Sequence, residues 1–261
     1  MSPLLLTIAL LLSLSAHSNE NVLIFTADEF EQMMEKGYEV VRADAEKGDA
    51  DAQFNLGYMY DLGKGIPENA AEAVKWYRKA AEQGFAEAQY NLAWMYDNGE
   101  GVPENAAETV KWYRKAAEQG YVKAQSNLAW MYYQGKGVPK NAAKAIKWFR
   151  KAAEQGHADA QYNLAWMYDN GEGVPENAAE AVRWFRKAAE QGDASAQHNL
   201  ALMYHNGKGV PENKIKAYLW WSLAKAQGHE TAKTNLEILK RDMTKEQIAK
   251  AQALAMKVLG V

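Results

Sequence analysis

A few side chains in this 261-residue chain have types and spacings that could do chemistry. Ser222 and Lys225 form the pattern S-x-x-K, which carries the nucleophile of serine penicillin-recognising enzymes. No S-D-N or K-T-G sequence accompanies it. His198 and His205 are seven residues apart, so one helical face would carry both, and they could in principle share a metal ion. No set of Ser, His and Asp has the spacing of a catalytic triad.

Two loop patterns could hold an ion or a phosphate. The acidic segment 97–100 superficially resembles a calcium loop, but its ligand spacing is wrong. The repeated G-x-G loops lack the lysine and the hydroxyl that a phosphate-binding loop needs. We therefore expect no catalysis, no metal and no cofactor. The alternative is an envelope hydrolase of the penicillin-recognising, β-lactamase-like kind, or a binder of peptidoglycan ligands.

Aromatic side chains offer a better candidate, because they recur four residues apart. Tyr90 and Trp94 are one such pair, and carboxylates and amides accompany them, as at Asp97 and Asn98. Flat apolar contacts with polar groups beside them suit a protein or peptide partner. The predicted binding positions are Phe54, Tyr58, Asp61, Tyr90, Trp94, Asp97, Trp130, Tyr133, Tyr162, Trp166, Asp169, His198 and His205. For the tryptophans, packing between neighbouring repeats is an equally good interpretation.

A 36-residue repeat must position these side chains. Prolines recur at this interval from Pro67 to Pro211, and glycines from Gly48 to Gly228. In the unit 85–120, apolar spacing predicts a first helix over 86–97, a Gly- and Pro-containing loop, and a second helix that Asn105 and Glu108 begin as a capping box. Each unit alone has too few apolar side chains to offset the entropy of ordering, so the units must stack.

The repeated motifs A-x-A-Q-x-N-L-A-x-M-Y, G-x-G-V-P-x-N and A-x-K-W-Y-R-K-A-A-E-Q-G are similar to those of the Sel1-like repeat (SLR) family of the tetratricopeptide superfamily. This resemblance covers residues 49 to 240. It implies an all-α fold, a right-handed solenoid of antiparallel helix pairs, and a non-enzymatic scaffold that binds a protein or peptide in its concave groove. The recurring asparagines, such as Asn91, lie beside the packing face, where we expect hydrogen bonds to neighbouring loops.

The ends of the chain differ from the repeats. Residues 1–18 contain an apolar run and small residues at Ala16 and Ser18, which predict a cleaved signal peptide and an exported, periplasmic or secreted protein. Membrane association is expected only if that segment is retained. We expect a capping half-repeat at 19–48 with a possible break at Gly37, and five repeats over 49–228 (49–84, 85–120, 121–156, 157–192 and 193–228). A partial sixth repeat and a capping helix should follow over 229–261.

Composition excludes several classes of protein. The net charge is −3, so a nucleic-acid partner is not expected. The chain has no cysteine and therefore no disulfide.

The fifth repeat carries two leucines where the preceding repeat is charged. Leu219 and Leu223 replace Arg183 and Lys187, so a further element must cover them. We expect the helix that starts at Thr244 to do so. Self-association through the groove or the solenoid ends is a further, purely structural possibility.

Overall fold

The computed structural model describes residues 27–259, with side chains described from residue 37 onward, and the predicted signal peptide lies outside this range. Residues 27–259 form helices and turns without a strand, which confirms the predicted all-α class. The chain divides into two compact units, one ending at Tyr121 and one beginning at Val122. No helix among the described residues has the length and apolar character to cross a membrane.

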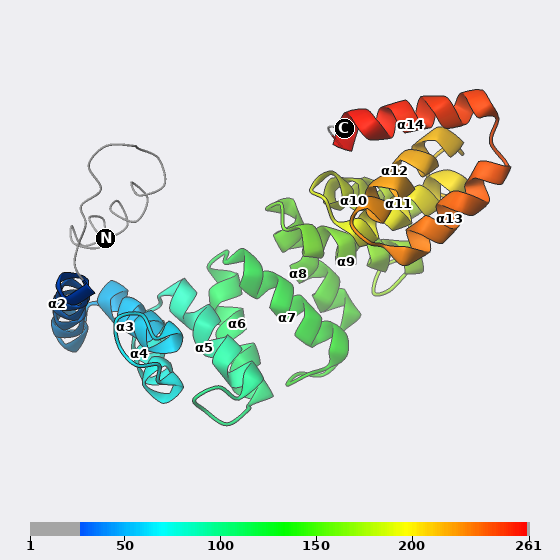
Figure 1. The fold of residues 1–261 in the computed structure, drawn as a ribbon. Coiled ribbons are helices and arrows are strands. Elements are labelled where there is room, and N and C mark those ends of the chain that lie inside the picture. Colours follow the sequence, from blue (N-terminus) through cyan, green and yellow to red (C-terminus); the bar gives the residue numbers. More distant parts are fainter. Residues whose placement is uncertain (1–26, 260–261) are drawn as a thin grey trace. The chain divides into compact units, whose positions relative to one another are not determined.

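Each unit is a short solenoid of antiparallel helix pairs joined by tight loops (Figure 1). The helices of the first unit are α2 (Ala27–Glu46), α3 (Ala50–Leu62), α4 (Ala70–Glu82), α5 (Ala86–Asn98) and α6 (Ala106–Glu118). Those of the second unit are α7 (Val122–Gln134), α8 (Ala142–Glu154), α9 (Ala158–Asn170), α10 (Ala178–Glu190), α11 (Ala194–Asn206), α12 (Lys214–Ala226), α13 (Glu230–Arg241) and α14 (Lys245–Leu259). In each 36-residue repeat, we call the first helix A and the second helix B.

Asparagine begins each helix B, as predicted, but only half of the expected capping box forms. The Asn105 side chain accepts hydrogen bonds from the backbone N–H groups of Ala107 and Glu108, both at 3.1 Å. The Glu108 carboxylate does not return to Asn105. It accepts from Lys111 at 2.8 Å and from Trp112 Nε1 at 3.0 Å, while the Asn105 N–H donates to the Tyr96 carbonyl at 3.0 Å. The cap therefore closes the loop between helices A and B of one repeat.

Glycine ends each helix B with a left-handed residue; Gly120, for example, has φ +93°. The expected break at Gly37 is wrong, because α2 continues through it. Gly37 is buried, as is Ala73 at the same position of the next repeat. A small residue is needed there for close packing.

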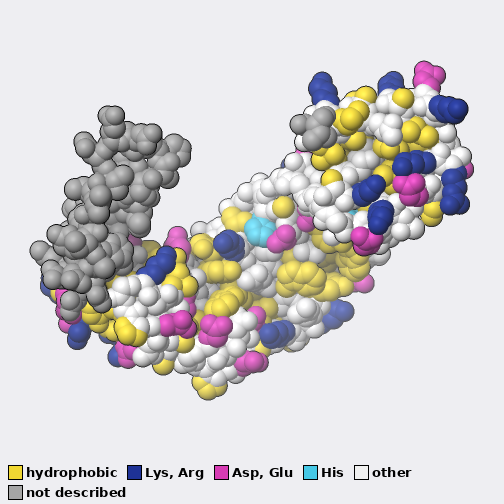
Figure 2. All heavy atoms as spheres, in the orientation of Figure 1, with side chains coloured by type: hydrophobic (Ala, Val, Ile, Leu, Met, Phe, Trp, Pro, Cys, Tyr) yellow, Lys and Arg dark blue, Asp and Glu magenta, His cyan; other side chains and the backbone are white. Residues whose placement is uncertain are grey.

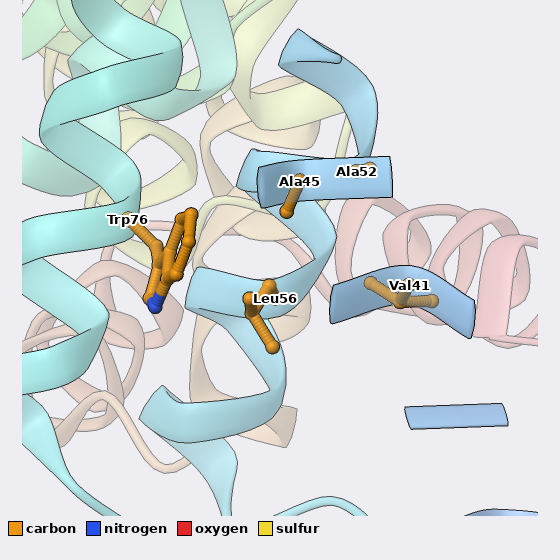
Figure 3. Close-up of a cluster of buried hydrophobic side chains, with 5 residues drawn as sticks. All are labelled: Val41, Ala45, Ala52, Leu56 and Trp76. Atoms are coloured by element: carbon orange, nitrogen blue, oxygen red, sulfur yellow. The ribbon is translucent and has the colours of Figure 1, made fainter. Parts of the chain in front are cut away.

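The core of the first unit joins α2 to the first repeat. Val41 and Ala45 of α2 pack against Ala52 and Leu56 of α3, with Trp76 of α4 beside them (Figure 3). In the later repeats up to residue 192, an alanine pair and a large aromatic residue from helix B are buried in the same way, and the fifth repeat buries Ala224 and Trp221. Close helix approach through alanine, with the aromatic residues filling the remaining space, therefore holds neighbouring repeats together.

The last helix caps the second unit. The Thr244 hydroxyl accepts from the Gln247 N–H at 3.2 Å, and Gln247 Oε1 accepts from the Thr244 N–H at 3.0 Å, so the predicted capping box is complete. Helix α14 packs on α12. Leu223 of α12 is only 6% exposed, although the equivalent Lys187 is exposed. Helix α14 thus packs on the helix that carries the two leucines, as predicted, but Leu219 is only half-buried.

Candidate functional site

The second unit contains a pocket of about 440 Å³ between helix α9 and helix α11. Its apolar lining is Tyr162, Trp166, Phe185, Leu202 and Met203, and its polar lining is Asp169, Asn170, Asn199, Asn206 and Lys208. Helix A residues of two consecutive repeats supply most of these side chains, because a helix presents positions four and seven apart on one face. Apolar walls with a few convergent polar groups are typical of ligand sites.

Lys208 lies at one side of the pocket and is held by two carboxylates. Its ammonium is 2.8 Å from Asp169 Oδ1 and 3.0 Å from Glu176 Oε1, and it donates to the Asp169 carbonyl at 3.2 Å. These interactions, the hydrogen bond to Asp169 first, raise the pKa of Lys208. Two carboxylates and one ammonium leave this side of the pocket with one excess negative charge.

Tyr162 lines the pocket beside Asn199. The Asn199 side chain donates to the Tyr162 hydroxyl at 3.5 Å. Burial, opposed by this hydrogen bond, raises the pKa of Tyr162, so the phenol stays protonated at neutral pH. In the first unit, Asn91 hydrogen-bonds Tyr77, which lies on helix B rather than helix A of the preceding repeat. The expected hydrogen bonds from these asparagines to loops are therefore wrong at both positions, since the partner is a tyrosine of the preceding repeat.

An aromatic row extends from the pocket along the second unit. The rings of Trp166 and Tyr133 meet edge to face with centroids 6.0 Å apart, and Tyr133 meets Trp130 at 5.5 Å in the same way. Trp130 is 38% exposed, so it is not sealed between repeats. The structure thus brings together five of the predicted site residues: Trp130, Tyr133, Tyr162, Trp166 and Asp169.

The two predicted histidines lie apart from this row. His198 is 9% exposed and stacks on His229 with ring centroids 4.5 Å apart. Burial, with a smaller contribution from His229, lowers the pKa of His198 to about 4. His205 lies 5.5 Å from the Trp221 ring. Among the described residues, no group of three metal-ligating side chains is found. Both histidines belong to the contact between α11 and α12.

The predicted positions of the first unit form two aromatic groups of their own. Phe54 stacks on Tyr58, and Tyr58 is 38% exposed and accepts a hydrogen bond from Lys64 at 3.3 Å. Asp61 accepts from the Tyr77 hydroxyl at 3.1 Å. Burial raises the pKa of Asp61, and the hydrogen bond from Tyr77 opposes this shift.

Tyr90 lies 5.6 Å from the Tyr113 ring and 5.1 Å from the Tyr121 ring. Trp94 is 38% exposed, and Asp97 is half-buried. Tyr90 is half-buried as well. Each of these three side chains therefore keeps part of its surface in contact with solvent.

The S-x-x-K pattern falls within one helix. Ser222 is half-buried in α12, and Lys225 is exposed in its last turn. Lys208 and the wall residues Leu202 and Asn206 were missed by the sequence reasoning. Leu202 and Asn206 could have been found, because they lie 36 residues after Trp166 and Asn170.

Comparison with known proteins identifies the repeats. The family model described as Sel1 repeat matches residues 50–85, 86–121, 122–157, 158–193 and 194–229. A search of curated proteins finds no match.

Several solved structures are similar to the chain, and two of them are more than a third identical to it in sequence. One is a protective antigen of uropathogenic Escherichia coli strains with an SLR fold, 35% identical, TM-score 0.75, with 87% of this chain and 51% of that chain covered. The other is a Sel1 repeat protein from Oxalobacter formigenes, 37% identical, TM-score 0.68, with 76% of this chain and 84% of that chain covered. The chain spans about half the length of the E. coli protein. With five consecutive matches to the repeat, this chain belongs to the Sel1 repeat family, whose members are typically scaffolds for protein interaction.

Proposed function

We propose that the chain is an exported, non-enzymatic scaffold that binds a protein or peptide partner on the helix A face of its repeats. The pocket between α9 and α11, together with the aromatic row that leads to Trp130, is the observation that carries this proposal. The helix A aromatic residues of the first unit, such as Tyr58 and Trp94, are exposed as well and offer that unit a contact region of its own.

The chemistry of the pocket fits an extended or helical peptide. Trp166, Tyr162 and Leu202 provide an apolar wall that could hold one large side chain of the partner. The amides of Asn170 and Asn206 each offer a donor and an acceptor, which can pair with a peptide backbone. The excess negative charge beside Lys208 favours a partner segment that is neutral or basic rather than acidic.

Site-specific photo-crosslinking in cells tests the site. A photoreactive amino acid at Leu202 should trap a partner as a discrete band, because this residue lines the pocket. The same amino acid at Lys147, which is exposed on α8 outside the pocket, is the control and should give no such band. Equal trapping from both positions would contradict the proposed site.

A matched pair of variants separates binding from folding. Trp166→Ala should abolish the crosslink from Leu202, because it removes the pocket wall. Trp148→Ala removes a half-buried tryptophan from α8 and should leave the crosslink intact. Loss of the band in both variants, with equal thermal stability, would mean that the pocket has no special role.

Export forms a separate part of the proposal. It is supported by the apolar run in residues 1–18 and by Ala16 and Ser18 before the expected cleavage point. Mass spectrometry of the protein from its native cells should give an N-terminus at Asn19. A protein that retains residues 1–18 and stays in the cytoplasm would refute export without affecting the binding site.

A further inference from the structure

Lys208 is the one cation that lines the pocket of the second unit, among the residues that the structure describes, and oxygen atoms of the chain already surround it. Its ammonium lies 2.8 Å from Asp169 Oδ1, 3.0 Å from Glu176 Oε1 and 3.2 Å from the Asp169 carbonyl oxygen. An ammonium has three N–H groups, so these three oxygen atoms can take all of them. Lys208 therefore has no N–H group left for a carboxylate of a partner.

The amides of the pocket keep their acceptors. Asn170 donates to the Trp166 carbonyl at 2.8 Å, and Asn199 donates to the Tyr162 hydroxyl at 3.5 Å. Within the described part of the chain, no donor contacts the side-chain oxygen of either amide. These oxygen atoms and the carboxylate of Asp169 suit an occupant that donates hydrogen bonds.

The charge beside the pocket also favours a cation. Helix α9 has two acidic residues and no basic residue. The lysine and arginine side chains of the second unit that are visible in Figure 2 gather instead at the end where α13 and α14 lie. A cationic side chain of a partner would therefore meet no basic residue on the α9 wall of the pocket.

The first repeat shows where such a cation can lie. Lys64 Nζ is 4.8 Å from the centre of the Tyr58 ring, and Tyr58 stands three repeats before Trp166. In the fourth repeat, Glu172 takes the position of Lys64. No cation of the described residues lies over the Trp166 ring. A helix A ring at this position can thus carry a cation, and the fourth repeat does not supply one.

We propose that the pocket takes an arginine side chain of the partner, with its guanidinium over the Trp166 ring and its stem against Leu202 and Met203. Because this arginine belongs to the partner of the proposed function, its assignment rests on that function. Arginine fits better than lysine, since the planar guanidinium stacks on aromatic rings. Its five N–H groups are spread over that plane, so they can reach Asp169 and the amide oxygens together.

Three small probes test the charge of the occupant: N-acetyl-arginine amide, the uncharged N-acetyl-citrulline amide of similar shape, and N-acetyl-glutamate amide. The NMR signal of the Trp166 indole N–H, identified by its absence in Trp166→Phe, reports binding to the chain. The arginine probe should bind at least about fivefold more tightly than the citrulline probe, because only the former adds a cation. The glutamate probe should cause no shift. Equal binding of the arginine and citrulline probes, or no shift with the arginine probe, would overturn the assignment.

A lysine supplied by the chain itself should block the site. Glu172→Lys introduces the residue type of Lys64, which two other repeats also have at this position, so the variant should fold. The new ammonium should cover the Trp166 ring and weaken binding of the arginine probe at least about fivefold. Glu100→Lys makes the same change at the equivalent position of the first unit, and it should leave the Trp166 shift unchanged. Wild-type binding by Glu172→Lys would show that the guanidinium does not lie over Trp166.

Removal of Lys208 distinguishes a site for a cation from a site for an anion. Lys208→Met removes a like charge, so it should bind the arginine probe about two- to fivefold more tightly, the effect of one partly exposed charge pair. If the glutamate probe bound the wild type and lost affinity in Lys208→Met, the pocket would be a site for an anion and the assignment would be wrong. Should Lys208→Met fail to fold, Glu172→Lys still decides.

The crosslinking experiment at Leu202 tests the partner separately from its charge. A crosslink without preferential binding of the arginine probe would overturn the arginine and leave the proposed function standing. Preferential binding of the arginine probe without a crosslink would contradict the proposed function, and with it the partner that carries the arginine.

Discussion

Gln119 Nε2 donates a hydrogen bond to Gln89 Oε1 at 2.8 Å, which ties the end of helix B to the helix A of the same repeat. Gln89 in turn donates to the Ala81 carbonyl of the preceding helix B at 3.0 Å. The same Gln–Gln hydrogen bond occurs in every repeat, at Gln83–Gln53, Gln155–Gln125, Gln191–Gln161 and Gln227–Gln197. The buried glutamines 53, 89, 161 and 197 therefore each connect two successive helix pairs through polar groups.

The buried member of this pair should matter more than the exposed one. Gln89 is 3% exposed and makes two hydrogen bonds, one to the Ala81 carbonyl and one from Gln119. The Ala81 carbonyl keeps its bond from the Gly84 N–H in Gln89→Leu, but the loss of both glutamine bonds should cost about 1–3 kcal/mol of unfolding free energy. Gln119 is exposed, so Gln119→Leu should cost about 1 kcal/mol or less. Urea denaturation of both variants measures the difference. Equal losses would show that the hydrogen bond to Ala81 contributes little.

The repeat period predicted the helices well, because apolar residues and glycines mark them directly. The expected helix over 86–97 differs from α5 by one residue at its end. The glutamine pairs were missed because a polar residue inside an apolar motif has no meaning until its partner, thirty residues away, is placed beside it. The same reason explains Lys208, whose role depends on Asp169 and Glu176 of the preceding repeat.

The predicted binding residues could be identified from the sequence only where a residue's position in helix A decides whether its side chain is exposed. Trp130 and Trp166 follow the helical spacing and lie in one aromatic row. His198 has the same spacing but is buried, because His229 and Trp221 approach it from later helices. Helical spacing alone therefore does not predict the exposure of a helix A residue when side chains of later helices pack on it.

Two glycines of one loop should respond differently to substitution by alanine. A Cβ atom at Gly101 would clash with the backbone carbonyl group of Ala70, and the φ of Gly101 is +66°. At Gly99 the nearest atom, Glu104 Cγ at 3.0 Å, belongs to a flexible side chain, and φ is +71°. Both variants carry the cost of a left-handed residue, about 1 kcal/mol, but Gly101→Ala must also move backbone.

Thermal denaturation followed by circular dichroism measures this difference. Gly101→Ala should melt at a clearly lower temperature than Gly99→Ala, and the wild type should melt highest. If the two variants melted together, close approach of Gly101 to the preceding repeat would not contribute to stability.

Removal of α14 should destabilise the second unit. A chain that ends at Asp242 loses the cover on α12 and exposes Leu223, and burial of one leucine is worth about 1.5–3 kcal/mol. Val258→Ser is the control, because Val258 is 61% exposed and should not affect stability. Urea denaturation with tryptophan fluorescence as the probe should show an earlier transition only for the shortened chain. An unchanged transition would mean that α14 is not a cap.

His198 should make the second unit sensitive to acid. Its pKa is lowered to about 4 in the folded protein, from 6.5 in the unfolded chain, because burial and His229 disfavour the charged form. Since the folded pKa is the lower one, the unfolded state binds more protons between these values. Stability is therefore complete above pH 6.5 and falls as the pH drops from 6.5 to about 4, by up to about 1.4 kcal/mol per pH unit.

Replacement of His198 isolates this effect from the carboxylates that also titrate in acid. Tyrosine occupies the equivalent positions 90 and 162, so His198→Tyr should fold and should lose less stability between pH 6.5 and pH 4 than the wild type. His229→Asn removes the neighbouring imidazole but not the burial, so it should shift the pKa of His198 upward only slightly, as measured by NMR titration. Identical pH profiles for wild type and His198→Tyr would show that His198 does not titrate with folding. A large upward shift in His229→Asn would mean that the stacked imidazole, rather than burial, sets the pKa of His198.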